Sequence, residues 1–433
     1  MNALRQTEQA ILMEGREWTR RRLQEELQRD ADAQPALCPQ SRAPLTNTRR
    51  RDLQLDTVAG RVELRVPIGW SQSLSRWINP VRQAWGLADY QRASPELQAR
   101  LAYTATEVPS YERAAKMAQT WGTPLSDGRI HHHIQILGTT AETLDLPAPQ
   151  PAPREPELSL VIEMDGWMAR ERGPDWAAGR RKKNPQRIAW HEIKSAVIYR
   201  LEQRVEKDSG RGLLVEKFIV ATAPLTSPVD FGAAVQAQAR RRGLGRAKFI
   251  YIVMDGAVWL WDLAEDRFAT AIKTLDFQHA SQHLWAVAHA LHGEGTPEAR
   301  AWAESLLHSL RHGGEGRVVR KLEELLVPTP SAPAKPGSGK SVSSPARKAR
   351  RRPGARAVIA REVAYFQSHR EHLHYERVAE AGAPIGSGAV ESLCGQLQAR
   401  FKGRGQFWER VGLRHLLAVN TLFKNRDDSH LWN

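Results

Sequence analysis

Two aspartates and one glutamate stand where they could build a site for phosphoryl transfer. Asp165 ends the run Leu-Val-Ile-Glu-Met-Asp, Asp255 ends Tyr-Ile-Val-Met-Asp, and a glycine follows each. Short apolar runs are typical of buried strands, so we expect both aspartates at strand ends, where the glycine lets the chain turn away. Glu391 opens a predicted helix. Carboxylates gathered in this way bind Mg²⁺ or Mn²⁺, and two such ions stabilise both the attacking and the leaving oxygen of a phosphoryl displacement.

The helix that begins near Glu391 should pack against a core. Its apolar residues recur at helical spacing and are Val390, Leu393, Leu397 and Phe401. We therefore take Asp165, Asp255 and Glu391 as candidate catalytic residues and as the candidate metal ligands.

Asp276 is the alternative for the second catalytic aspartate. It precedes His279 in Leu-Asp-Phe-Gln-His, at the end of another predicted strand. Asp276 could instead cap the following helix, with His279 hydrogen-bonded near the site or in contact with DNA. His279 and His283 are also four residues apart, the spacing of two metal ligands on one helix.

The composition favours a polyanionic partner. The chain has 433 residues and a formal net charge of +15, which makes nucleic acid the first partner to consider. No run approaches the ~18 apolar residues of a membrane-spanning helix, and the start lacks the apolar core of a signal peptide. Only Cys38 and Cys394 are present, far apart, so we expect no disulfide framework. These features predict a cytoplasmic protein that joins the nucleoid when bound to DNA.

The first 146 residues divide into three parts. We expect a helix over residues 1–35, a β region over 36–92 and a helical module over 93–146. Val62, Leu64 and Val66 alternate with charged residues, as in a half-buried strand. In the helical module, Ser110 and Ser126 are predicted N-caps around the break at Trp121-Gly122, which gives a helix-turn-helix pattern.

DNA recognition is one interpretation of that pattern. Arg129 and His132 would then face DNA from the second helix. Plain helical packing is the alternative, because helical hairpins are common.

A proline-rich linker at 147–157 precedes a predicted α/β catalytic domain at 158–425. Three strands, a helix, a strand, a further strand and then helices match the order of a ribonuclease-H-like mixed sheet. In that fold the first and fourth strands are neighbours, which would join Asp165 to Asp255. A helical subdomain would be inserted at about 286–380.

Two basic stretches could contact DNA. Residues 327–360 combine Pro, Ser and Gly with basic residues that include Arg350, Arg351 and Arg352, so we expect disorder and contact with phosphates, or else a solvated tether. Near the C-terminus, basic side chains stand beside aromatic ones, a combination that suits phosphate contact and base stacking. These residues are Arg400, Lys402, Arg404 and Trp408. The alternative is a helix end whose basic residues meet the helix dipole.

Several motifs in this order resemble one family. They are Met-Asp-Gly at 164–166, Met-Asp-Gly-Ala-Val-Trp-Leu-Trp at 254–261, Leu-Asp-Phe-Gln-His-Ala-Ser-Gln-His-Leu-Trp at 275–285 and Gly-Ser-Gly-Ala-Val-Glu-Ser at 386–392. The sequence resembles insertion-sequence transposases of the ISKra family, relatives of the Mutator-like DDE transposases, over roughly residues 37–425. The resemblance implies a ribonuclease-H-like core, two Mg²⁺ or Mn²⁺ ions, cleavage at element ends and strand transfer into target DNA. It also implies double-stranded DNA as partner and a homodimer on that DNA.

The resemblance also implies a zinc ribbon in the β region, and here the sequence departs from it. Ser41 stands where a second cysteine would follow Cys38, and residues 70–77 contain no cysteine. Zinc needs about four Cys, His or carboxylate ligands, so we expect a degenerate ribbon without zinc, held by packing that could involve Trp70, Trp77 and Trp85.

Two other functions remain possible at this point. One is a metal-dependent nuclease of the same fold that does not transfer strands. The other is a non-catalytic DNA-binding protein derived from a transposase.

Overall fold

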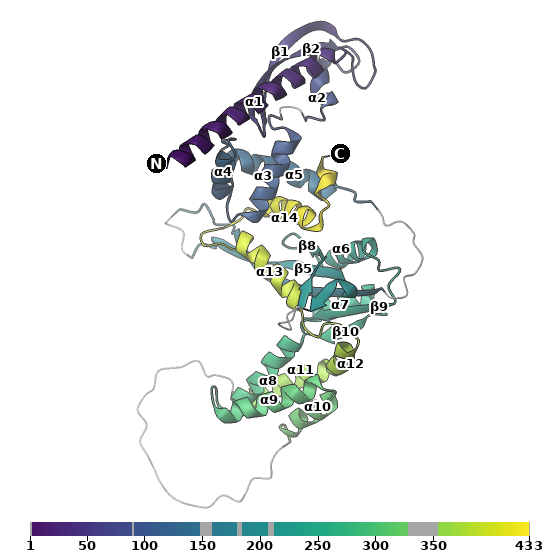
Figure 1. Cartoon of the computed structure of the whole chain (residues 1–433). Coiled ribbons are helices and arrows are strands. Elements are labelled where there is room, and N and C mark those ends of the chain that lie inside the picture. Colours follow the sequence, from purple (N-terminus) through teal and green to yellow (C-terminus); the bar gives the residue numbers. More distant parts are fainter. Residues whose placement is uncertain are drawn as a thin grey trace, which may run out of the picture. The chain divides into compact units, whose positions relative to one another are not determined.

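The computed structural model describes residues 2–88, 91–147, 158–179, 184–206, 212–327 and 354–432. Contacts divide the chain into two compact units (Figure 1). Unit 1 comprises Met1–Leu146, Glu171–Ile188 and Ala399–Asn433, and unit 2 comprises Pro147–Arg170 and Ala189–Gln398. The sequence predicted one catalytic domain over 158–425, so the division differs. Residues 148–157 and 328–353, which include Arg350, Arg351 and Arg352, lie outside the described residues.

Unit 2 is mixed α/β and is built on a five-stranded sheet with the order β10-β9-β4-β5-β8. Its strands are β4 (Ser159–Arg172), β5 (Ile188–Arg200), β8 (Phe218–Ala221), β9 (Phe249–Met254) and β10 (Ile272–Leu275). β4 and β9 pair in parallel, and Met164 lies opposite Met254. The predicted adjacency of the first and fourth strands is therefore confirmed. Asp165 directly follows Met164, and Asp255 directly follows Met254.

The prediction that the first strand ends at Asp165 was wrong. β4 continues to Arg172, and Asp165 lies within it. Gly166 does not provide a turn. A Cβ atom there would overlap the side chain of Glu192, which extends from β5. The glycine therefore makes room for a side chain of the neighbouring strand.

The two faces of β4 have different partners, because successive side chains of a strand point to opposite faces. Leu160, Ile162 and Met164 are fully buried in a core shared with α6 (Pro228–Arg241) and α7 (Val258–Arg267). Glu163 and Asp165 point to the opposite face of the strand. On that face Glu163 meets the start of α13 (Gly388–Phe401).

Helices follow the last strand of the sheet. They are α8 (Phe277–His292), α9 (Pro297–Arg311), α10 (Glu315–Glu324), α11 (Ala355–Ser368) and α12 (Tyr375–Glu380). Their shared core includes the fully buried Leu284, Leu322 and Phe366. The segment predicted as a helical insertion is therefore helical where it is described. The short strands β6 (Arg204–Glu206) and β7 (Gly212–Leu214) form a small hairpin.

Unit 1 combines a β hairpin with helices. Its elements are α1 (Ala3–Ala33), β1 (Thr46–Thr57), β2 (Gly60–Ser71), β3 (Arg76–Ile78), α2 (Pro80–Ala84), α3 (Pro95–Glu107), α4 (Tyr111–Thr120), α5 (Asp127–Thr143) and α14 (Arg410–Asn425). The Ser110 and Ser126 hydroxyls accept backbone N–H bonds at the starts of α4 and α5, which confirms both predicted caps.

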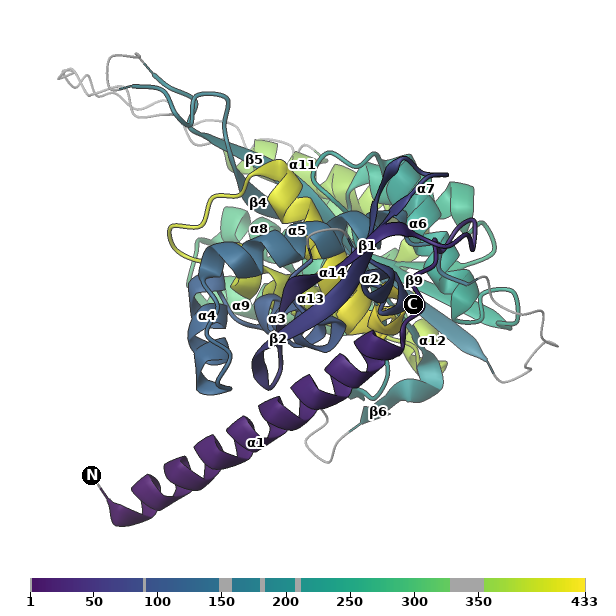
Figure 2. The same ribbon diagram turned by 90° about the horizontal axis from the view of Figure 1, so that it is seen from above.

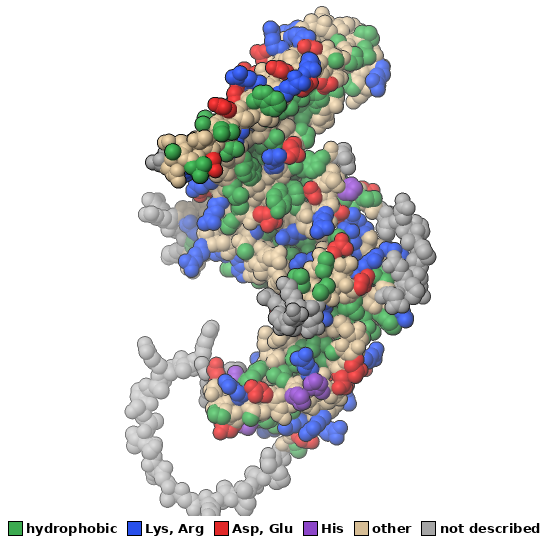
Figure 3. Space-filling model, in the orientation of Figure 1, with side chains coloured by type: hydrophobic (Ala, Val, Ile, Leu, Met, Phe, Trp, Pro, Cys, Tyr) green, Lys and Arg blue, Asp and Glu red, His purple; other side chains and the backbone are tan. Residues whose placement is uncertain are grey.

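The hairpin core is aliphatic, and one of the three predicted tryptophans, Trp85, packs against it. Leu55, Val62 and Leu64 are buried together with Ala31 of α1. Trp77, which the sequence suggested as a packing residue, is 44% exposed. The first half of α1 extends beyond the hairpin (Figure 2), and basic and acidic side chains are interleaved along it (Figure 3). Among the described residues, no helix has the length and apolar character needed to cross a bilayer.

Three serines surround the predicted zinc-ribbon cysteine. The Ser73 hydroxyl lies 3.8 Å from the Cys38 sulfur, 3.0 Å from the Ser41 hydroxyl and 3.1 Å from the Ser71 hydroxyl. One thiol and three hydroxyls hydrogen-bond each other in this cluster, and neutral hydroxyls are poor zinc ligands.

We therefore expect the purified protein to contain no stoichiometric zinc. Elemental analysis after dialysis checks this. A matched variant, Ser41→Cys/Ser71→Cys/Ser73→Cys, should gain a thiolate site that binds Co²⁺ or Zn²⁺. One zinc per chain in the wild-type protein would contradict the prediction.

Candidate active site

Asp165 and Asp255 form the acidic centre of unit 2. Both are half-buried, and each accepts a backbone N–H: Asp165 from Gly166 at 2.6 Å and Asp255 from Ala257 at 2.9 Å. Burial raises the pKa of Asp165, and the negative charge of Asp255 raises it further. Two carboxylates that oppose each other's ionisation are stabilised by a cation between them.

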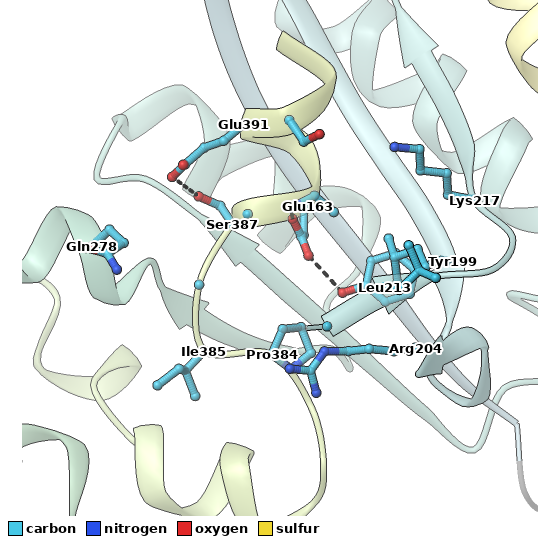
Figure 4. A pocket seen from close by; sticks show the side chains of 16 residues that line it. Glu163, Tyr199, Arg204, Leu213, Lys217, Gln278, Pro384, Ile385, Ser387 and Glu391 are labelled. Carbon is cyan, nitrogen blue, oxygen red and sulfur yellow. Dashed lines mark hydrogen bonds between the residues drawn. The ribbon is translucent and has the colours of Figure 1, made fainter. Parts of the chain in front are cut away.

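Glu391 lies in the first turn of α13 and is exposed. The Ser387 hydroxyl donates to its Oε1 at 3.1 Å (Figure 4). Cys394 is one turn further along, and burial raises the pKa of its thiol to about 12. The charges of Asp165 and Glu391 both act on this thiol. The thiol therefore lies within the electrostatic influence of both carboxylates.

The fit to a metal is partial. Within the described ranges, no group of three or more His, Cys, Asp or Glu side chains is already arranged to hold a metal ion. The oxygen donors are of the type that Mg²⁺ and Mn²⁺ prefer, and the pair Asp165–Asp255 fits a cation electrostatically. Glu391 would have to turn away from Ser387 to join that pair.

Asp276 has another role. Its carboxylate is fully buried and accepts four hydrogen bonds, two from His279 and one each from the backbone N–H groups of Gln278 and Ser387. Burial would raise the pKa of Asp276, but these bonds outweigh it and lower the pKa. Asp276 caps α8, and its oxygens are occupied, which favours Asp255 as the second catalytic aspartate.

The two histidines of α8 have different partners. His279 Nδ1 donates to Asp276 at 2.7 Å, and this bond raises the pKa of His279. His283 Nδ1 donates to Glu362 of α11 at 2.5 Å, and its ring stacks on Tyr365. Their spacing therefore serves two separate carboxylates rather than one shared metal.

Glu163 is a buried carboxylate that the sequence interpretation missed. It is 1% exposed, and its Oε2 accepts the backbone N–H groups of Ala389 at 2.8 Å and Val390 at 3.0 Å. The Tyr199 hydroxyl donates to its Oε1 at 2.8 Å. Glu163 therefore satisfies the first free N–H groups of the helix that carries Glu391. It also lines a cavity of about 720 Å³ beside Ser387 and Glu391 (Figure 4).

Glu163 and Asp276 hold the same turn from two sides. Asp276 accepts the N–H of Ser387, and Glu163 accepts the N–H groups of Ala389 and Val390, two and three residues later. We call this pair of carboxylates the turn clamp. The sequence contained one signal for it: Glu163 and Asp165 share a face of a central strand, and a buried carboxylate requires donors.

Tyr365 of α11 enters the same region. A Cβ atom at Gly256 would overlap the Tyr365 ring, so the glycine next to Asp255 makes room for it. The buried Tyr365 hydroxyl has no hydrogen-bond partner among the described residues, and its pKa is raised by burial and by the charge of Asp255.

Gly256→Ala should therefore displace Tyr365 and disturb Asp255. We expect a loss of about 1–3 kcal/mol in the free energy of unfolding, the usual cost of overpacking, together with weaker metal-dependent activity. Denaturant titration measures the first effect. Gly395→Ala is the control, because an added Cβ meets nothing there and alanine in a helix stabilises by about 0.5–1 kcal/mol. Equal stability of the two variants would contradict the proposed packing.

Arg400 was wrongly predicted to contact DNA. Only 4% of the residue is exposed, and its guanidinium donates to the backbone oxygens of Ala105 at 2.7 Å and Pro109 at 3.1 Å. Burial lowers its pKa to about 10. Arg400 therefore links elements inside unit 1. Trp408 is half-buried beside it and donates from Nε1 to the Phe401 oxygen.

The other predicted DNA contacts of unit 1 are placed differently. Arg129 donates to the buried Asp56 carboxylate at 2.5 Å, so this arginine ties α5 to the hairpin, and its contact with DNA stays a prediction. His132 and Arg404 are exposed, and Lys402 is half-buried. Phe407 packs against Trp176, with ring centroids 5.1 Å apart.

Comparisons with known proteins give a distant structural similarity. No family model matches the chain, and no curated protein matches it. Among solved structures, it is similar to a chain of the Drosophila P element transposase strand transfer complex, with 10% sequence identity and a TM-score of 0.34. The match covers 77% of this chain and 93% of that chain. A superposition this loose assigns no residue a role.

Proposed function

We propose that this chain is a DDE transposase of an insertion sequence, of the ISKra kind, that cleaves element ends and transfers the 3′ ends into target DNA. The observation that carries the proposal is the parallel register of β4 and β9, which sets Asp165 beside Asp255. The negative charges of Asp165 and Glu391 both act on the Cys394 thiol, which supports a common site for them. The strand order of unit 2 and these three carboxylates support the proposed reaction.

Asp165, Asp255 and Glu391 would hold Mg²⁺ or Mn²⁺. When bound, the ions supply charge stabilisation for both the attacking and the leaving oxygen. The chain's own residues do the rest. The turn clamp fixes the first turn of α13, and burial, which raises the pKa of the Cys394 thiol, keeps that thiol uncharged. His279 holds the clamp carboxylate Asp276 in place.

Double-stranded DNA is the proposed partner, both as element ends and as target. The formal net charge of +15 supports it. Candidate DNA contacts are His132, Lys402, Arg404, Arg350, Arg351, Arg352 and Trp408. A homodimer on DNA would act on two ends together.

A strand-transfer assay tests the proposal. Labelled DNA of the element ends is incubated with the protein and a supercoiled target plasmid, in Mg²⁺ or in EDTA. We expect cut ends and plasmid-joined ends in Mg²⁺ alone. Cut ends without joining would favour a nuclease, and binding without cutting in Mg²⁺ would favour a non-catalytic DNA-binding protein.

A further inference from the structure

Unit 1 has an arginine-lined groove that the proposed reaction does not use. It lies on the β hairpin and has a volume of about 610 Å³. Its floor is apolar and includes the buried Val66, Ile68 and Ile78. Arginines from separate segments stand over that floor: Arg51 from β1, Arg76 from β3 and Arg92 from the segment before α3. We call this feature the arginine groove.

The charge of the groove is unbalanced. Arg51, Arg76 and Arg92 are exposed. Among the described residues of its lining, Asp52 is the one acid, and it pairs with Arg65 at 3.6 Å with its side chain 85% exposed. A concave surface with several cations and a single, solvated acid concentrates positive potential.

One further arginine fixes the shape of the rim. The Arg82 guanidinium donates to the backbone oxygens of Ala88 and Gln91, both at 2.9 Å. It therefore holds the loop that leads to Arg92. The backbone oxygen of Arg92 also accepts the Asp56 N–H at 2.7 Å, so the fold fixes the backbone from which this side chain extends.

An aromatic residue stands at the edge of the groove. Trp77 is 44% exposed, and the Arg49 guanidinium lies 4.5 Å from its ring centroid. The Trp77 ring also meets Trp70 edge-on at 6.1 Å. Stacking aligns the planar Arg49 side chain beside the groove, where its donors can reach an anionic oxygen.

The basic surface continues toward α5 within the same unit. Arg92 also lines a second cavity, of about 270 Å³, together with His132 and Ile136. An extended surface of this kind suits a linear polyanion better than a single small anion.

We propose that the arginine groove binds the phosphate backbone of duplex DNA. Guanidinium groups on separate elements match successive phosphates, and each neutralised phosphate releases counterions. Contacts of this type position a protein but carry no base sequence. The inference rests on the proposed function only for the identity of the polyanion, since the groove plays no part in the chemistry.

The test is the double variant Arg51→Ser/Arg92→Ser in the full chain. Its affinity for a 30-base-pair duplex is measured by fluorescence anisotropy in EDTA at several salt concentrations. Losing two phosphate contacts should reduce the slope of log K against log salt by about 1.8, at 0.9 per contact, and weaken binding by tens of fold at about 0.1 M salt. Random and element-end duplexes should be affected equally.

The matched control is Arg22→Ser/Arg29→Ser, which removes the same charge from α1. Both control arginines are exposed and pair with Glu26 of their own helix at 2.5 Å. If both double variants weakened DNA binding equally, the loss would come from the lower net charge alone, and the proposal would be overturned. An unchanged salt slope, or a loss confined to element-end duplexes, would also overturn it. Circular dichroism confirms that each variant is folded.

The outcome is separable from the proposed function. Binding is measured without metal, so a wild-type protein that fails to cut DNA could still show the predicted slopes. Conversely, if the protein transfers strands but Arg51→Ser/Arg92→Ser leaves the salt slope unchanged, the groove proposal fails while the proposed reaction stands.

Discussion

Asp255→Asn should abolish metal-dependent DNA cleavage while leaving DNA binding in EDTA unchanged. The amide keeps the size of the side chain and can still accept the Ala257 N–H bond, but it removes the charge that a divalent cation requires. Removing one preorganised stabilising group costs about 10²–10³ in rate, so the loss should be at least that large. Asp165→Asn and Glu391→Gln should act in the same way. Cleavage of labelled end DNA in Mg²⁺ measures the effect.

Asp276→Asn is the matched control, because it makes the same substitution at the rival aspartate. Its carboxylate accepts four hydrogen bonds and is fully buried. An amide nitrogen cannot accept, so we expect a loss of about 1–3 kcal/mol in the free energy of unfolding from unsatisfied donors. Slower cleavage should accompany that instability without being abolished. Normal cleavage by Asp255→Asn, with none by Asp276→Asn, would mean that the second catalytic aspartate is Asp276.

Glu163→Ala should impair the position of Glu391 without removing a proposed metal ligand. It leaves the N–H groups of Ala389 and Val390 without an acceptor and the Tyr199 hydroxyl without a partner. Loss of a residue that orients a metal ligand typically costs about 10–100-fold in metal affinity or activity. We expect the Mg²⁺ concentration for half-maximal cleavage to rise by a factor in that range.

Two further variants separate positioning from plain destabilisation. Glu163→Gln keeps one oxygen that can accept both N–H groups of α13, so it should restore most of the metal dependence. Tyr199→Phe removes only the donor on the other oxygen and should affect stability more than Mg²⁺ dependence. An unaltered Mg²⁺ requirement in Glu163→Ala would exclude the turn clamp as a positioning device.

Local patterns explain what the sequence predicted well. The Ser110 and Ser126 caps depend on hydrogen bonds to N–H groups three residues away, and the apolar stripe of α13 depends on helical spacing. The pairing of the first and fourth strands followed from the order of elements. These features require no knowledge of distant contacts.

The missed features all depend on contacts between distant parts of the chain. Glu163 is separated by 226 residues from Ala389, the donor that defines its role. Arg400 reaches back 295 residues to the oxygen of Ala105. From the sequence alone, a basic residue beside aromatic ones predicts a DNA contact. Only the fold shows that the Arg400 side chain is buried. Gly166 was misinterpreted for the same reason, since only the fold shows Glu192 next to it.

Iron-directed cleavage of the protein backbone tests the central claim most directly. Fe²⁺ replaces Mg²⁺, and peroxide with ascorbate generates hydroxyl radicals that cut the chain near the bound ion, with the fragments identified by mass spectrometry. The account predicts cuts near residues 165, 255 and 391, suppressed by excess Mg²⁺ and lost in Asp165→Asn. Cuts confined to other segments, or a pattern unchanged in Asp165→Asn, would contradict a metal centre at these three carboxylates.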